Sequence, residues 1–127
     1  KKNALELKAK CKVIHSNLFS NINEKFDLIV ANLPYIEKES FLDLQREIIL
    51  YEPHEALFGG VDGLDIIKTF LRHVERHLNG NGMLVIEFGE GQDTLLKQEL
   101  LRLKFGNPKF VRDLNQIKRV LCVKKDT

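Results

Sequence analysis

The tetrapeptide Asn32-Leu33-Pro34-Tyr35 contains the residues of this chain best suited to hold a flat polar group. Asn32 offers an acceptor oxygen and two donor hydrogens, Pro34 stiffens the backbone, and Tyr35 provides a flat aromatic face. The backbone carbonyl of Leu33 adds a further acceptor. Together these groups could accept both N–H bonds of a planar NH2 group and stack against its plane.

The chemistry that this arrangement suits is methylation of an amide nitrogen. Such a nitrogen is a weak nucleophile because its lone pair is delocalised into the carbonyl, so positioning must carry much of the catalysis. Asn32 and Leu33 could aim the nitrogen at a methyl sulfonium and stabilise the positive charge that develops. Taken alone, however, Asn-x-Pro-Tyr is more often an ordinary turn after a strand.

The predicted elements place this tetrapeptide at the end of a strand. Residues 26–31 (FDLIVA) form a run of branched apolar residues, which is typical of strands buried on both faces. Residues 11–15 and 82–88 are predicted as two more core strands. Because an open parallel sheet binds its ligands beyond the C-terminal ends of its strands, the tetrapeptide is expected at the ligand-binding edge.

Helices and an antiparallel pair complete the predicted fold. Residues 62–78 have apolar side chains at helical spacing with Gly80 as a C-cap, and residues 92–103 form a second helix. Residues 110–113 and 117–124 are predicted as an antiparallel pair of strands. This order indicates an α/β fold, mostly parallel with an antiparallel C-terminal edge. The longest irregular stretch, residues 34–63, is expected to be a functional loop.

Length and composition indicate one domain, residues 1–127, because the chain can bury one hydrophobic core but not two. The net charge of +2 is too small to require a nucleic-acid or membrane partner. No signal peptide or membrane-length apolar run is found. Cys11 and Cys122 lack metal-binding spacing and fit a reducing compartment. We therefore expect a soluble cytoplasmic protein.

A longer motif accompanies the tetrapeptide. Residues 51–60 (YEPHEALFGG) are followed by residues 61–64 (VDGL), and the strand at 82–88 contains Glu87 and precedes Gly89. With this motif the sequence resembles the HemK/PrmC family of release-factor glutamine methyltransferases. Family members carry Asn-Pro-Pro-Tyr, then Glu-Pro-x-x-Ala-Leu and Gly-Gly-x-Asp-Gly-Leu, then a strand ending in Glu and Gly. The resemblance implies a partial Rossmann-like class I methyltransferase sheet that lacks the first strands.

The resemblance also implies roles for individual residues. Asn32 and Tyr35 would be the catalytic residues that bind the substrate glutamine, with Leu33 and Pro34 contributing backbone. Leu33 departs from the family's usual proline and is similar to the form found in ribosomal RNA adenine dimethyltransferases. The Glu-Pro-x-x-Ala-Leu stretch favours glutamine over adenine. Its Glu52 and Pro53 are candidate substrate contacts, although a buried carboxylate that caps backbone amides is an equal alternative for Glu52.

The methyl donor that the resemblance implies is S-adenosylmethionine. Family members bind it with a Gly-x-Gly turn and an acidic residue that ends the next strand, and the sequence starts after both motifs. Asn17 stands where the family commonly has an aspartate near the adenine, so Asn17 and Asn32 are the candidate cofactor contacts. No metal is expected, because His73 and His77 have zinc-compatible spacing without a third ligand.

Three functions stay open. The first is methyl transfer to the glutamine of a Gly-Gly-Gln loop in a peptide chain release factor. The second is N6-methylation of adenine in RNA or DNA, since a flipped adenine also presents a planar amine, although the low net charge argues against a nucleic acid as direct substrate. The third is a noncatalytic α/β module, or a fragment whose sheet needs further strands.

The missing cofactor motifs lead to a testable expectation. We expect the 127-residue chain to bind S-adenosylmethionine weakly or not at all, because most of the groups that hold the cofactor in the family have no counterpart in its sequence. Isothermal titration calorimetry of the chain with the cofactor measures this directly. Micromolar binding would contradict the expectation.

Overall fold

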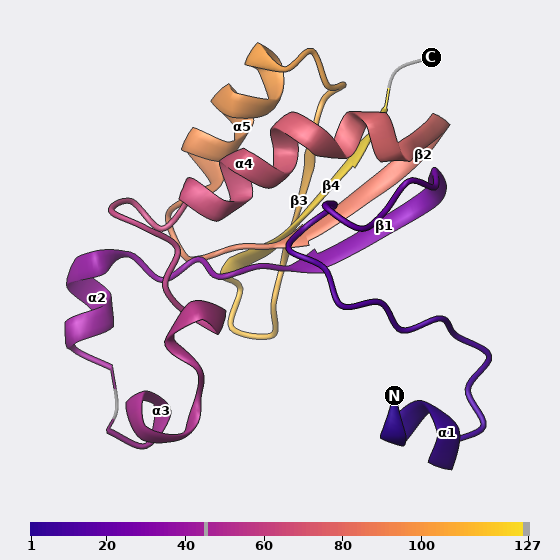
Figure 1. Cartoon of the computed structure of the whole chain (residues 1–127). Helices are drawn as coiled ribbons and strands as arrows, with labels where there is room; N and C mark the ends of the chain where they lie inside the picture. Colours follow the sequence, from indigo (N-terminus) through magenta and orange to yellow (C-terminus); the bar gives the residue numbers. More distant parts are fainter. Residues whose placement is uncertain (45, 126–127) are drawn as a thin grey trace.

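The computed structural model describes residues 1–44 and 46–125, and it shows a mixed sheet with two helices on one face (Figure 1). The strands are β1 (Phe26–Asn32), β2 (Leu78–Glu87), β3 (Lys109–Arg112) and β4 (Lys118–Lys124). Their order in the sheet is β1-β2-β4-β3. β1 and β2 are parallel, whereas β4 is antiparallel to both β2 and β3. The α/β class and the antiparallel C-terminal edge are confirmed, but the parallel part is smaller than predicted.

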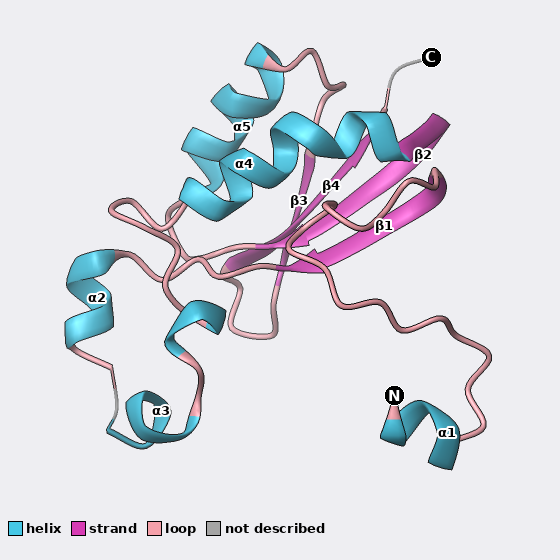
Figure 2. Ribbon diagram, in the orientation of Figure 1, coloured by secondary structure: helices cyan, strands magenta, loops and turns pink. Residues whose placement is uncertain are grey.

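The helices form two groups (Figure 2). α4 (Asp65–Val74) and α5 (Asp93–Arg102) lie against the sheet, and a 3-10 turn, η2 (Glu75–His77), links α4 to β2. The connection from β1 to α4 contains α2 (Lys38–Leu42), α3 (Arg46–Tyr51) and the 3-10 turn η1 (His54–Ala56), while α1 (Lys2–Glu6) begins the chain. Residues 34–63 are therefore not the irregular loop that was predicted. None of the helices described has the length and apolar character that crossing a membrane requires.

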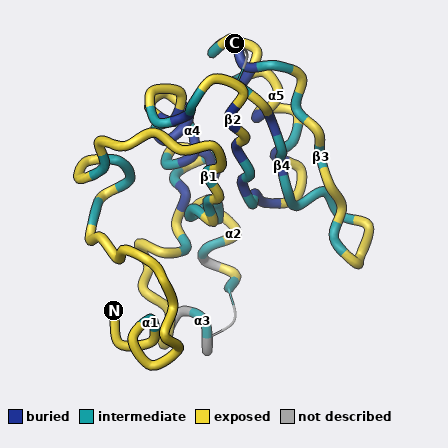
Figure 3. Tube along the Cα trace, turned by 90° about the vertical axis from the view of Figure 1, so that its right-hand side faces the viewer, coloured by how far each residue is buried: buried dark blue, intermediate teal, exposed yellow. Residues whose placement is uncertain are grey.

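The hydrophobic core lies between the sheet and the pair α4 and α5. Side chains alternate between the faces of a strand, so Leu84 and Ile86 of β2 point to the same side as Leu121 of β4. All three are fully buried. Figure 3 shows buried positions along β2. The helices contribute Ile67, Phe70, Leu71 and Val74 from α4 and Leu96 and Leu100 from α5. This packing fixes the strand ends at which the candidate site lies.

The opposite face of β1 is not covered by any of the residues described. Leu28 and Val30 are 53% and 68% exposed, whereas Ile29 and Ala31, which point to the other face, pack against the core. β1 is also an edge strand of the sheet. An exposed apolar edge strand can pair with another chain. The interpretation of the chain as a fragment that needs further strands therefore stays open.

The strand predicted for residues 11–15 is wrong. These residues form no regular element, and Val13 and Ile14 are 46% and 36% exposed. A strand requires a hydrogen-bonding partner, and the four-stranded sheet of the described residues ends at β1 without pairing to this segment. A short apolar run cannot supply that partner by itself.

The boundary between α4 and β2 also differs from the prediction. The helix was predicted to reach residue 78 with Gly80 as its C-cap, but α4 ends at Val74 and Gly80 lies inside β2. Asn79 to Gly82 form an irregularity in the strand, because β2 advances from residue 78 to 83 while β1 advances from 26 to 28. Asn79 Nδ2 donates a hydrogen bond of 2.8 Å to Asp27 Oδ1, which attaches this irregular segment of β2 to β1.

Two neighbouring leucines of α5 test the described core. Leu100 is fully buried and Leu101 is 54% exposed. We expect Leu100→Ala to lower the free energy of unfolding by about 2–5 kcal/mol, because it leaves a cavity under the helix. Leu101→Ala should change it by less than about 0.5 kcal/mol. Urea denaturation of both variants measures the difference, and equal effects would contradict the orientation of α5.

Candidate active site

Strand pairing places the tetrapeptide at the carboxyl edge of the sheet. In the parallel pair β1 and β2, Asn32 lies opposite Glu87, so the two strands end side by side. Asn32 is exposed, while Leu33, Pro34 and Tyr35 are partly buried. The expected position at the ends of the parallel strands is therefore what the structure shows.

The side chain of Tyr35 returns across this edge to β2. Its hydroxyl donates a hydrogen bond of 2.8 Å to Oε1 of Glu87. Burial, and then the hydrogen bond to Glu87, raise the pKa of the Tyr35 hydroxyl above its ordinary value. The phenol is thus protonated at neutral pH and remains the donor in this contact. The bond ties the ring to the end of the neighbouring strand.

Gln92, which the sequence analysis did not single out, joins three loops around Tyr35. Its Nε2 donates to the backbone oxygens of Tyr35 at 2.9 Å and Asp62 at 3.3 Å. Its Oε1 accepts from the backbone N–H of Gly89 at 2.8 Å. The side chain is buried and lies directly before α5. A glutamine directly before a helix is not by itself a functional signal, so only its closeness to Gly89 in the sequence could have pointed to this role.

Two glycines of the glycine-rich string allow this close packing. A Cβ atom on Gly63 would lie 2.3 Å from the carbonyl oxygen of Tyr35, and its φ of +71° disfavours other residues. A Cβ atom on Gly59 would lie 2.8 Å from the Tyr35 Cα atom. This string therefore shapes the loop beside the tetrapeptide.

A cavity of about 120 Å³ opens beside the tetrapeptide. Asn32 and Tyr35 both line it, so the two residues border a common space rather than a packed interior. The other lining residues are Leu33, Pro34, Ile36, Ala56 and Leu57. Pockets for drug-sized ligands measure about 300–1,000 Å³, so this smaller cavity suits a single side-chain group rather than a drug-sized ligand.

The other predicted site residues lie elsewhere. Glu52 and Pro53 are exposed, directly before η1, and are not among the residues that line the cavity beside Asn32. Glu52 is therefore not the buried capping carboxylate that was its alternative. Asn17 is exposed and borders a different cavity, of about 370 Å³, with Phe19 and residues of the α4 and η2 region. The structure does not bring Asn17 and Asn32 into one pocket.

Asn17 and Asn32, the two candidate contacts for S-adenosylmethionine, border two separate cavities. The cavity beside Asn32 is too small for the cofactor, and Asn17 contributes to a separate one. In the described part of the chain, no group of three or more His, Cys, Asp or Glu side chains could hold a metal ion. His77 instead stacks on Phe19 with ring centroids 4.3 Å apart.

Comparisons with curated proteins give similar sequences across most of the chain. A bifunctional methyltransferase of Rickettsia typhi is 37% identical over 86% of this chain and 21% of its own length. A release factor glutamine methyltransferase of Thermodesulfovibrio yellowstonii is 36% identical over 86% of the chain and 39% of its own length. A ribosomal protein uL3 glutamine methyltransferase of Neisseria meningitidis is 39% identical over 70% of this chain and 29% of its own length. The chain thus spans well under half the length of these relatives.

Solved structures show the same fold at low sequence identity. One is a ribosomal protein L11 methylase from Lactobacillus delbrueckii. The match covers 99% of this chain and 50% of the methylase, at 17% identity and a TM-score of 0.66. The second structure is the E. cuniculi Mtq2-Trm112 complex, which is responsible for methylation of the eRF1 translation termination factor. The match covers 99% of this chain and 68% of the matched chain of that complex, at 22% identity and a TM-score of 0.57. The class I methyltransferase fold is confirmed. No family model matches the chain.

The role of Gln92 can be tested by removing its polar atoms. We expect Gln92→Leu to lower the free energy of unfolding by about 2–3 kcal/mol, because the buried Gly89 N–H and the Tyr35 carbonyl lose their partner. Gln98→Leu is the matched control, since Gln98 is exposed on the same helix. A loss no larger than that of the control, in chemical denaturation, would rule out the connecting role.

Proposed function

We propose that the tetrapeptide Asn32-Leu33-Pro34-Tyr35 holds the side-chain amide of a glutamine during N-methylation. The premise is that this chain is a member of the HemK/PrmC family of glutamine methyltransferases. The proposed substrate is a peptide chain release factor with the glutamine in its Gly-Gly-Gln loop. The observation that carries the proposal is the cavity bordered by both Asn32 and Tyr35 at the paired ends of β1 and β2. The release factor glutamine methyltransferase among the relatives supports this substrate.

The residues of the chain act by positioning. The side-chain oxygen of Asn32 and the carbonyl oxygen of Leu33 accept the two N–H bonds of the amide, and the ring of Tyr35 lies along the amide plane. Because the hydroxyl of Tyr35 is bonded to Glu87, the ring is held before the substrate arrives. Preorganised acceptors stabilise the charge that develops on nitrogen without reorganising during the reaction. Pro34 restricts the backbone between them.

S-adenosylmethionine is the proposed methyl donor of the whole protein, and when bound it supplies an electrophilic methyl group. The fold shared with class I methyltransferases supports this donor. The proposed contacts of this chain to it remain Asn17 and Asn32, which together do not form a pocket for it. Residues 1–127 are accordingly proposed as the C-terminal portion of a methyltransferase domain.

The proposed site of action is the cytoplasm, where release factors work. Cys11 and Cys122 are both free thiols, which fits a reducing compartment. The substrate is a protein rather than a nucleic acid in this proposal, because the charge of the chain is nearly balanced.

A second candidate substrate is a glutamine of a ribosomal protein. The observation in its favour is the relative named for ribosomal protein uL3, whose identity to this chain is 39%. The same amide chemistry would apply, because the acceptor group is identical. The two substrates differ only in the protein surface that surrounds the glutamine.

The proposal is tested in the full-length parent protein with labelled S-adenosylmethionine. We expect Asn32→Ala to lower the rate of release-factor methylation by about 100-fold or more, because the amide loses an acceptor that positions it. Incorporation of label into the release factor, and into ribosomal protein uL3 in a parallel reaction, distinguishes the two candidate substrates.

The matched control is Asn107→Ala, which removes an exposed asparagine between α5 and β3. The methylation rate of this variant should stay within about twofold of that of the unmodified protein. A surface substitution of this kind rarely changes stability, so the enzyme should stay folded. Methylation by Asn32→Ala at the control rate would refute the assignment of the site.

A further inference from the structure

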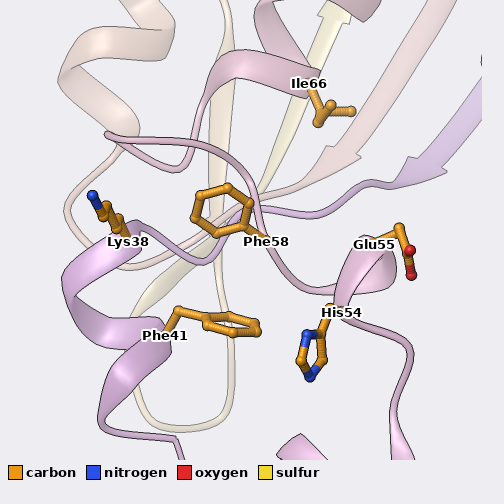
Figure 4. A pocket seen from close by; sticks show the side chains of 6 residues that line it. All are labelled: Lys38, Phe41, His54, Glu55, Phe58 and Ile66. Carbon is orange, nitrogen blue, oxygen red and sulfur yellow. The ribbon is translucent and has the colours of Figure 1, made fainter.

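The connection from β1 to α4 borders a third cavity, of about 520 Å³ (Figure 4). Phe41 of α2 meets the rings of His54 and Phe58 edge to face, with centroids 5.2 Å and 5.7 Å away. Ile66 of α4 adds to the apolar wall, and Lys38 and Glu55 are charged residues of the lining that the structure describes. Phe58 is 41% exposed, so its ring is accessible from solvent.

This apolar cavity and the cavity beside Asn32 share one piece of backbone. Ile36 and Phe58 form a parallel bridge, in which Ile36 N–H donates to Leu57 O at 3.0 Å and Gly59 N–H donates to Ile36 O at 2.9 Å. Ile36 and Leu57 line the cavity beside Asn32, while Phe58 lines the apolar cavity. Adjacent residues of an extended chain are about 3.3 Å apart, so a peptide can reach both cavities within a few residues.

The chemistry of the lining indicates what the cavity accepts. Three aromatic rings and an isoleucine favour an apolar side chain, and the volume is large enough for leucine, methionine or phenylalanine. Among the described lining residues, one cation, Lys38, is matched by one anion, Glu55, which does not single out a phosphate group as the ligand. In protein interfaces, a few side chains that fill well-packed pockets of the partner carry most of the binding energy.

We infer that this cavity, defined by Phe41, His54, Phe58 and Ile66, is a subsite for an apolar side chain of the protein substrate, located up to about four residues from the target glutamine. The inference rests on the proposed function, because the glutamine in the cavity beside Asn32 sets the position of the peptide. In this role the cavity helps to select the protein substrate and takes no part in the methyl transfer itself.

The test uses synthetic peptides with a Gly-Gly-Gln core and serines elsewhere, in which one serine on either side is replaced in turn by leucine. Each is titrated into the isotope-labelled full-length parent protein and followed by NMR. At one leucine position we expect binding about tenfold tighter than for the all-serine peptide, with shifts at Phe58 and Ile66. If no leucine position strengthens binding, the subsite is overturned.

Two variants and a control make the result specific. Phe58→Ala and Ile66→Ser should each abolish the advantage of the leucine peptide, and the second keeps the test valid if the first fails to fold. Phe26→Ala is the matched control, because Phe26 is 39% exposed but lies on β1 away from this cavity. An advantage that survives both variants would contradict the subsite.

The titration also separates this inference from the proposed function. Shifts at Asn32 and Leu33 without any effect of leucine would overturn the subsite and leave the amide site in place. A leucine effect that persists when the glutamine is replaced by serine, without shifts at Asn32, would support the apolar pocket but count against the proposed function. Binding of a single-stranded oligoadenylate that Phe58→Ala abolishes would instead assign the pocket to a nucleobase and overturn the inference.

Discussion

The hydrogen bond from Tyr35 to Glu87 is the contact on which the candidate site depends. It joins the loop that leaves β1 to the end of β2, and it exists because the parallel register sets Asn32 opposite Glu87. The core beneath α4 and α5 fixes that register from one face of the sheet, and the site occupies the edge. A tyrosine held in this way presents its ring at a defined angle without being ordered by a substrate, which reduces the entropic cost of binding.

The same loop is secured a second time through its backbone. Gln92 bonds to the carbonyl oxygen of Tyr35 and to Gly89, and Gly59 and Gly63 approach Tyr35 so closely that no side chain would fit. The tetrapeptide, the glycine-rich string and the turn after β2 therefore form one unit. Three motifs that are separate in the sequence are thereby brought into direct contact.

Local patterns predicted the position of the tetrapeptide at a strand end better than they predicted the extent of the sheet. The apolar run before Asn32 sufficed to place the tetrapeptide at a strand end, because that inference needs only the strand itself. The run at residues 11–15 looked equally strand-like, but strand formation depends on a partner, and periodicity does not reveal one. The Asn79 to Gly82 excursion was read as a turn after a helix, since polar and glycine residues favour both turns and bulges. Gln92 was missed because its importance lies in contacts across 30 and 57 residues of sequence.

The most direct test of the account is to observe the substrate amide itself in the site. A peptide with the Gly-Gly-Gln core and a nitrogen-labelled glutamine side chain would be bound to the full-length parent protein and examined by NMR. The account predicts nuclear Overhauser effects between the two amide protons and the ring protons of Tyr35, together with an upfield shift caused by the ring. A saturated complex in which the amide protons contact other residues and keep their solution shift would contradict it.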